Sequence, residues 1–150
     1  MAIASAICNT FKTEVLKAVH NFTASSGNTF NLALYTSSAS MGAATTAYTT
    51  TNEIANTAGS AYSAKGKALT SVTPVLDSST AVCDFANISW TSASFTANGA
   101  MIYNTTTDGG SGTTDAVCVI AFGSDKTATA GTFTIQFPAN DSSNAIIRLA

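Results

Sequence analysis

Alternating hydrophobic and polar positions recur in short runs along the 150-residue chain. Phe30, Leu32 and Leu34 form one such run, and Phe133 and Ile135 belong to another. A period of two places successive side chains on opposite faces of an extended chain, which is typical of half-buried β-strands. The runs predict about eight strands, at residues 29–35, 68–76, 81–90, 94–97, 100–104, 116–122, 132–137 and 145–149.

Residues 84–104 lie at the centre of this pattern, because they contain the only tryptophan and parts of separate predicted strands. Trp90 shares one face of its strand with other apolar residues, so we expect it in the core. Asn98 and Gly99 supply the positive φ that a tight turn needs, which predicts a turn between the strands on either side.

Proline, glycine and continuous apolar runs refine the strand pattern. Residues 116–122 are apolar at consecutive positions, which predicts a central strand covered on both faces. Pro74 has no amide hydrogen to donate, so its strand is expected at a sheet edge. Glycines in 105–115 and 123–131 predict a flexible hairpin loop and a turn.

A different period marks the N-terminal residues 3–22. Ile7, Phe11, Val15 and Val19 recur every four residues and form one apolar stripe, which predicts an amphipathic helix. The stripe is expected to pack on a sheet of its own domain, with docking on a neighbouring subunit as the alternative. One helix and about eight strands predict a mainly β fold. We expect one β-sandwich or jelly-roll-like domain over residues 1–150, with a single N-terminal α-helix.

Residues 36–67 have no periodic apolar pattern and consist mostly of Ser, Thr, Ala, Gly and Asn. A loop of this length is uncommon in a compact domain and often has a function. We interpret the segment as an interaction arm, in which Tyr48, Ile54 and Tyr62 are the candidate contact residues. A meandering loop with one short strand is the alternative.

Composition narrows the classes of partner. Only 9% of the residues are charged, against roughly 25% in an average globular domain. The net charge is −2 and the six basic residues are dispersed, which argues against nucleic acid as a partner. No apolar run approaches the ~20 residues of a membrane span, so no membrane partner is expected.

The three cysteines, Cys8, Cys83 and Cys118, include no Cys-x-x-Cys pair. Three buried, reduced thiols are the default expectation, and one bridge between Cys83 and Cys118 stays open as an alternative.

No arrangement of residues predicts catalysis. The only histidine, His20, is expected on the solvent side of the predicted helix, and the acidic residues are scattered singly. A paired-carboxylate or nucleophilic mechanism needs groups that meet in space, and no local pattern suggests such a meeting. We therefore expect no enzyme, no cofactor and no metal site.

Four blocks carry a resemblance to a known family: residues 7–22 (ICNTFKTEVLKAVHNF), 30–54 (FNLALYTSSASMGAATTAYTTTNEI), 86–104 (ANISWTSASFTANGAMIYN) and 122–150 (FGSDKTATAGTFTIQFPANDSSNAIIRLA). They resemble small virion structural proteins of tailed bacteriophages from marine and freshwater bacteria. The resemblance covers nearly the full chain and is most specific in the last two blocks. It implies a structural component of the phage particle, either capsid decoration or tail-associated, without catalytic residues.

The resemblance leads to the expectation of a capsid decoration (cement) protein located in the virion. It would form a homo-oligomer, with a trimer as the expected form, and bind the major capsid protein or other virion proteins. Phe11 and Val15 join Tyr48, Ile54 and Tyr62 as contact residues if the helix docks outside its own domain.

Two alternatives stay open. The first is a component of the tail, neck or fibre. The second is a carbohydrate-binding β-sandwich for host attachment, with Trp90, Tyr35 and Tyr103 as the first aromatic residues to consider.

Overall fold

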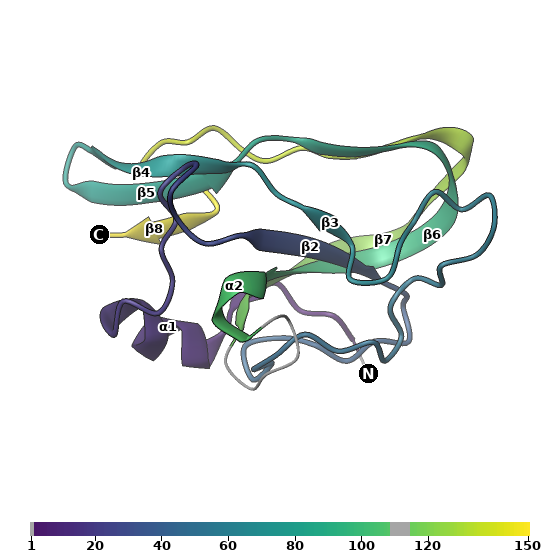
Figure 1. Ribbon diagram of the computed structural model, residues 1–150, viewed down its shortest axis with the longest axis horizontal. Helices are drawn as coiled ribbons and strands as arrows, with labels where there is room; N and C mark the ends of the chain where they lie inside the picture. Colours follow the sequence, from purple (N-terminus) through teal and green to yellow (C-terminus); the bar gives the residue numbers. More distant parts are fainter. Residues whose placement is uncertain (1, 109–114) are drawn as a thin grey trace.

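The computed structural model describes residues 2–108 and 115–150 and shows a mainly β architecture built from two antiparallel sheets (Figure 1). The predicted fold class, β-sandwich-like with an N-terminal helix, is confirmed. In chain order the elements are β1 (Ala6–Ile7), α1 (Asn9–Leu16), β2 (Phe30–Tyr35), β3 (Lys67–Ala68), β4 (Ser71–Asp77), β5 (Thr80–Phe85), β6 (Ile88–Asn104), α2 (Thr105–Asp108), β7 (Ala116–Ile135) and β8 (Ile147–Leu149). Most of the loop predicted at 105–115 lies outside the described residues.

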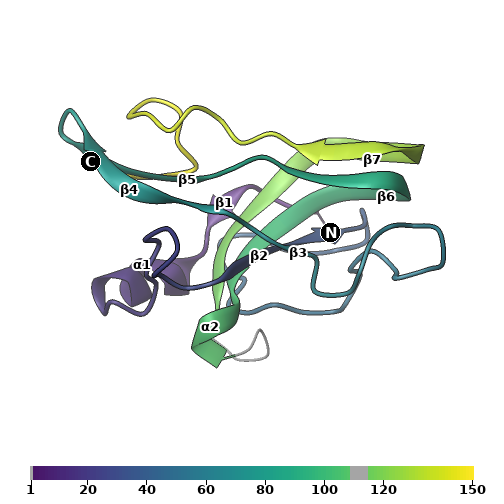
Figure 2. The same ribbon diagram turned by 45° about the horizontal axis from the view of Figure 1, so that its top comes forward.

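The larger sheet has the strand order β1-β7-β6-β2-β3, and the smaller sheet has the order β4-β5-β8. β6 and β7 run together as one ribbon that curves around one end of the molecule (Figures 1 and 2). The first half of β6 and the second half of β7 continue the layer of the small sheet (Figure 1). The second half of β6 pairs with β2, and the first half of β7 lies in the same layer. The two layers of the sandwich therefore share the same pair of strands.

β6 is continuous over 17 residues, so the predicted turn at Asn98 and Gly99 is wrong. Gly99 lies inside the strand and is paired with β2 on one side and β7 on the other. A Cβ atom at Gly99 would lie 2.7 Å from the carbonyl oxygen of Ile120 and 2.8 Å from the side chain of Ile3. The glycine is needed for this close approach and not for a reversal of the chain.

β7 is continuous over 20 residues, so the turn predicted at 123–131 is also wrong. The register between β6 and β7 shifts at several points, and positive φ values occur near these shifts: 54° at Ser92, 76° at Gly123 and 47° at Ala130. Such β-bulges bend a strand and increase its twist. The glycine-containing segment therefore bends the ribbon without ending the strand.

The run predicted as one strand at 81–90 is divided between the two sheets. β5 ends at Phe85, and β6 begins at Ile88 in the larger sheet. The predicted strand 68–76 is likewise divided between β3 and β4. Pro74 lies in β4, which is an edge strand with a register shift, so its predicted edge position is confirmed.

The predicted helix 3–22 is much shorter in the structure. Ile3 forms a bridge with Met41, and β1 pairs with β7, so the first residues are extended. The sequence stripe therefore continues through three different conformations, of which only the middle one is helical.

α1 ends in a Schellman-type arrangement. The amide of Val19 donates to the carbonyl of Glu14 (3.0 Å), and the amide of Ala18 donates to that of Val15 (3.2 Å). Ala18 has φ 58°, the left-handed conformation that this type of ending requires. The chain then reverses toward the sheet, and this reversal decides where the following histidine lies.

The core lies between the two layers and beneath α1. Residues 116–119 are all buried, which confirms the first part of the covered strand predicted at 116–122, whereas residues 120–122 are half-buried. Trp90 is 4% exposed and packs against Phe95, Tyr62 and Phe133, so its predicted core position is confirmed.

Candidate interaction site

Residues 36–67 fold back onto their own sheet. The amide of Ile54 donates to the carbonyl of Leu34 (2.9 Å), and the amide of Ala116 donates to that of Thr46 (3.1 Å). Glu53 forms an isolated bridge with Tyr35, but the segment contains no regular strand between β2 and β3. This corresponds to the meandering-loop alternative and not to a projecting arm.

Glu53 is the centre of the contacts that hold this segment. Its carboxylate accepts hydrogen bonds from the hydroxyls of Tyr48 (2.5 Å) and Tyr62 (2.8 Å) and from the amide of Lys65 (2.7 Å). The Tyr62 hydroxyl in turn accepts the amide of Leu34 in β2 (2.9 Å). One carboxylate thus joins three points of the loop to the central sheet, with charge-assisted bonds that are stronger than neutral ones.

All four tyrosines of the chain lie around Glu53. Tyr48 stacks on Tyr103 with ring centroids 4.7 Å apart, and Tyr35 donates to the carbonyl of Thr49 (2.7 Å). Burial raises the pKa of each tyrosine above its usual range, and the nearby Glu53 carboxylate raises it further. The phenols therefore stay protonated as hydrogen-bond donors, and this cluster fastens the loop instead of supplying a nucleophile.

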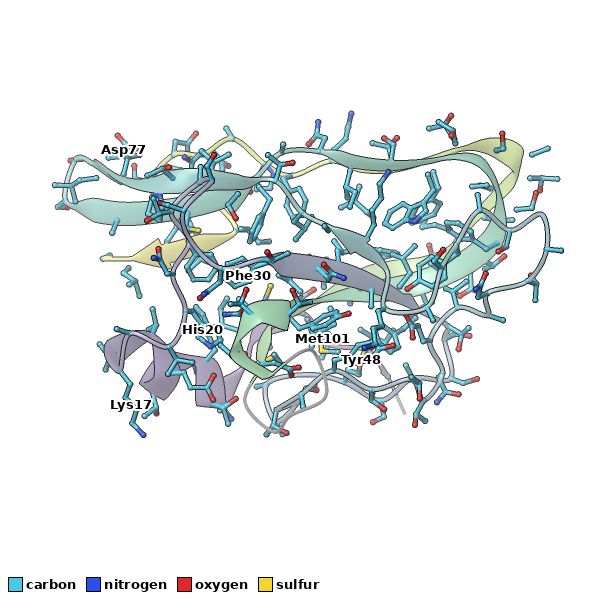
Figure 3. The ribbon with its side chains drawn as sticks, in the orientation of Figure 1. Lys17, His20, Phe30, Tyr48, Asp77 and Met101 are labelled. Atoms are coloured by element: carbon cyan, nitrogen blue, oxygen red, sulfur yellow. The ribbon has the colours of Figure 1, made fainter. Side chains whose placement is uncertain are left out.

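A second polar cluster is centred on His20, which is buried and not exposed as predicted. The reversal after α1 turns its ring inward, where Nε2 lies 2.9 Å from the Glu14 carboxylate and Nδ1 lies 3.0 Å from the Asn104 side-chain amide (Figure 3). The ring also packs 5.1 Å from that of Phe11. No spacing rule would have found this cluster, because its members come from α1, the following loop and the end of β6.

The hydrogen bonds around His20 determine its tautomer. The amide of Thr106 donates to Asn104 Oδ1 (2.9 Å), and the amide of Asn21 donates to Asn28 Oδ1 (2.7 Å). Both side-chain oxygens are thereby identified, so Asn104 Nδ2 donates to Asn28 and to His20 Nδ1. Nδ1 must then be unprotonated, and Nε2 carries the proton that is donated to Glu14.

The structure places three of the five candidate contact residues inside the chain's own core. Tyr62, Phe11 and Ile54 are 1%, 2% and 6% exposed. Val15 and Tyr48 are half-buried and pack against the core. Phe11, Ile54 and Tyr62 therefore offer little surface to a partner of the folded chain, whereas Val15 and Tyr48 keep part of theirs.

The aromatic residues considered for carbohydrate binding are also buried. Tyr35 and Tyr103 have no exposed surface, and Trp90 is covered in part by Lys67, whose Nζ lies 6.0 Å from the ring centroid. A sugar-binding platform needs an exposed ring face, so the expectation that these three residues provide one is corrected.

The three cysteines are free and buried. Burial raises the pKa of Cys8 to about 11 and that of Cys83 to about 12, and it raises the pKa of Cys118 as well. The default expectation of reduced, buried thiols is confirmed, and the Cys83–Cys118 bridge is not formed. Thiols with so little thiolate at neutral pH are poor nucleophiles.

An apolar groove of about 420 Å³ lies between α1 and the small sheet. Phe11 and Val15 line its helix side, and Ile147 and Leu149 of β8 line its sheet side. Figure 1 shows the two walls at the same end of the molecule, with the C-terminus between them. The groove is an apolar concavity that α1 does not cover.

A larger hollow of about 570 Å³ lies along the bent part of β7. Phe122 and Phe133 contribute apolar surface, but the exposed Lys126 also lines the hollow. Lysines and bulges at a sheet edge are among the means by which it resists strand addition. This side of β7 is therefore poorly suited to pairing with another chain.

Within residues 2–108 and 115–150, no three His, Cys, Asp or Glu side chains are arranged to hold a metal ion. Over the same ranges, none of the helices has the length and apolar character needed to cross a bilayer. Comparisons of the chain with protein-family models, with curated proteins and with solved structures find no match.

Proposed function

We propose that this chain is a structural protein of a tailed-phage virion, and specifically a capsid decoration protein. The observation that carries the proposal is the sequence resemblance of residues 86–104 and 122–150 to that family. The low fraction of charged residues and the Ser/Thr-rich surface suit extended contacts with other proteins. In this role the chain would act in the virion, as a homo-oligomer, on the major capsid protein.

Residues 36–67 form the surface that would meet the shell. Ala44, Thr46 and Thr50 are exposed on this segment, while Glu53 and the tyrosines beneath it hold the backbone in place. Binding by a loop that is already ordered avoids the entropy cost of ordering it on contact. Several such loops on one oligomer would then bind neighbouring capsomers together, and their weak contacts would combine through multivalency.

A cryo-EM map of particles of a phage that encodes this chain tests the proposal. Density for the chain on the outer shell, at junctions between capsomers, is the expected result. Density confined to the neck, tail or fibres would overturn the decoration role in favour of the tail-associated alternative. Absence of the chain from purified particles would overturn both.

The role of the loop has its own test in binding to shells that lack the chain. A variant with Ala44→Asp, Thr46→Asp and Thr50→Asp is expected to lose binding while keeping its fold. A variant with Thr129→Asp, Thr132→Asp and Gln136→Asp is the matched control and should bind normally, since the first two positions are exposed on β7 and the third is exposed just after it. Equal binding by both variants would remove 36–67 from the contact.

A further inference from the structure

Asn104 ends β6 and caps the helix that follows it. Its Oδ1 accepts the amide of Thr106 (2.9 Å), two residues further on, which is the hydrogen bond of an N-cap residue. The amide nitrogen of the same side chain donates to His20 Nδ1 (3.0 Å) and to Asn28 Oδ1 (3.0 Å). One side chain therefore serves α2 with its oxygen and His20 with its nitrogen.

The side chain of Asn104 cannot turn over without loss. Half a turn would place its nitrogen against the amide of Thr106 and its oxygen against Asn28 Oδ1, which already accepts the amide of Asn21 (2.7 Å). Asn104 is 0% exposed, so a polar atom that loses its partner there stays desolvated. Of the two orientations, only the observed one satisfies all of these neighbours while His20 Nδ1 is unprotonated.

A proton on His20 Nδ1 would oppose this orientation. The neutral ring accepts from Asn104 at Nδ1 and donates to Glu14 from Nε2 (2.9 Å). A protonated imidazole donates from both nitrogens, so Nδ1–H would face the N–H of Asn104. The Glu14 carboxylate is in place to pair with the new charge, as a buried charge requires. The proton would therefore gain an ion pair on one side of the ring and lose a hydrogen bond on the other.

The side chains packed around the ring are apolar or stay neutral in acid. Aromatic rings from α1, the following loop and β2 contact it: Phe11, Phe22 and Phe30. Burial, followed by two nearby carboxylates, raises the pKa of Cys8 to about 11. Cys83 lines the apolar groove together with His20, and burial raises its pKa to about 12. Both thiols therefore keep their protons from neutral to acidic pH.

Glu14 is the charge that faces the ring. The carboxylate of Asp115 in β7 accepts a backbone amide (2.8 Å), and its carbonyl accepts the amide of Asn104 (2.8 Å). The lysines of the helix region are exposed to solvent: Lys12 and Lys17. A change in the protonation of His20 is therefore transmitted through Glu14 on one side and Asn104 on the other.

We propose that His20 is a proton-operated switch for the cap of α2. On protonation, Asn104 turns its oxygen toward Nδ1–H and gives up the amide of Thr106, so α2 loses its cap. The same helix also holds the start of β2, because the amide of Thr29 donates to Thr106 Oγ1 (2.8 Å) and the amide of Thr105 donates to the carbonyl of Thr29 (2.8 Å). Figure 3 shows His20 between α1 and α2.

Acid would therefore loosen α2 and the entry to β2 while the rest of the sandwich stays folded. The inference does not rest on a role in the virion.

NMR of the ¹⁵N-labelled full chain between about pH 8 and pH 5 tests the proposal. The ring nitrogens of His20 report its protonation. Hydrogen exchange of the Thr106 amide, relative to an unstructured chain at the same pH, reports the cap. Its protection should fall by at least about fivefold as His20 takes up its proton, as loss of an N-cap does. The amide of Leu34, which is held by Tyr62 in the other polar cluster, is the control and should keep its protection.

Two outcomes of this titration would overturn the proposal. One is a Thr106 amide whose protection is unchanged while His20 titrates. The other is a His20 that stays neutral in the folded chain over the whole pH range.

Two variants separate the switch from a general effect of acid. Asn104→Asp can cap α2 with one oxygen and accept Nδ1–H with the other, so Thr106 should keep its protection over the whole range. Glu14→Gln keeps an acceptor for Nε2–H but removes the charge that pairs with the imidazolium, so protonation and uncapping should move together to lower pH. Circular dichroism verifies the fold of each variant. Uncapping at the wild-type pH in both variants would show that α2 responds to acid without His20, and the proposal would fail.

Discussion

Phe122 and Phe133 lie on the same strand, yet their ring centroids are only 6.3 Å apart. Eleven residues of straight strand would separate them by roughly 36 Å. β7 must therefore fold back on itself between them, and β6 follows it through the matching register shifts. The sandwich is closed at this end by a bent ribbon instead of a loop.

The bend in β7 predicts that a glycine at position 130 stabilises the fold. Ala130 has φ 47°, which is costly for a residue with a Cβ atom, so Ala130→Gly should raise the free energy of unfolding by about 0.5–1 kcal/mol. Ala128→Gly, at a regular position opposite Phe95, should lower it by a similar amount. Urea denaturation measures both changes. A loss of stability in both variants would show that the left-handed conformation at Ala130 stores no strain.

The tyrosine cluster predicts an order of stability losses. Tyr62→Phe removes a donor from Glu53 and leaves the buried amide of Leu34 without its acceptor, which should cost about 2 kcal/mol. Tyr48→Phe removes one donor from the same carboxylate and should cost about 1 kcal/mol. Denaturant midpoints compare the two variants. The reverse order would mean that the hydroxyl of Tyr62 does not join the loop to β2.

The raised pKa values predict that alkaline pH unfolds the protein. The folded state holds the protons of its tyrosines and cysteines more tightly than the unfolded state does, because burial raises each pKa. The stability from this difference is complete below the unfolded pKa values, about 8.5 for Cys and 10 for Tyr, and declines as pH rises above them. Tyrosinate absorbance should therefore appear together with the loss of circular dichroism. Tyrosines that ionise near pH 10 in a folded chain would contradict this expectation.

The tautomer of His20 is open to direct measurement. ¹⁵N NMR of the native chain at neutral to mildly alkaline pH should show an unprotonated Nδ1 and a protonated Nε2, as the bonds to Asn104 and Glu14 require. Asn104→Asp replaces the donor at Nδ1 by an acceptor, so Nδ1 should gain a proton in that variant. A protonated Nδ1 in the wild type would mean that the network runs in the opposite direction.

Local periodicity was sufficient to predict the β class, the central strand near residue 116, the edge position of Pro74 and the buried Trp90. It failed where one local signal has two structural outcomes. Gly99 and Gly123 have the chemistry of turns, but the first allows strands to approach closely and the second lies in a bend. The apolar stripe of residues 3–22 is compatible with extended chain, helix and loop, and the structure contains all three.

The polar clusters were beyond the reach of sequence patterns for a different reason. Glu53 is close to Tyr48 and Tyr62 in the chain but meets them only through the turns of an irregular loop that has no periodic pattern. His20 meets Asn104 only after two distant parts of the chain have been brought together. A lone polar residue in a loop or at a helix end is usually solvated, so the expectation of an exposed His20 followed the common case. The left-handed conformation of Ala18 turns His20 inward. Because this position is not a glycine, the sequence does not indicate the reversal.

The pairing of β1 with β7 joins Ala6 to Val119. During synthesis on a ribosome, β1 therefore emerges long before its partner strand β7 has been made. β2 likewise waits for the second half of β6, since Phe30 pairs with Asn104. Such long-range pairings are slow to form and leave strand edges open in the meantime. The nascent chain thus depends on residues 118 and 119 to give β1 its partner.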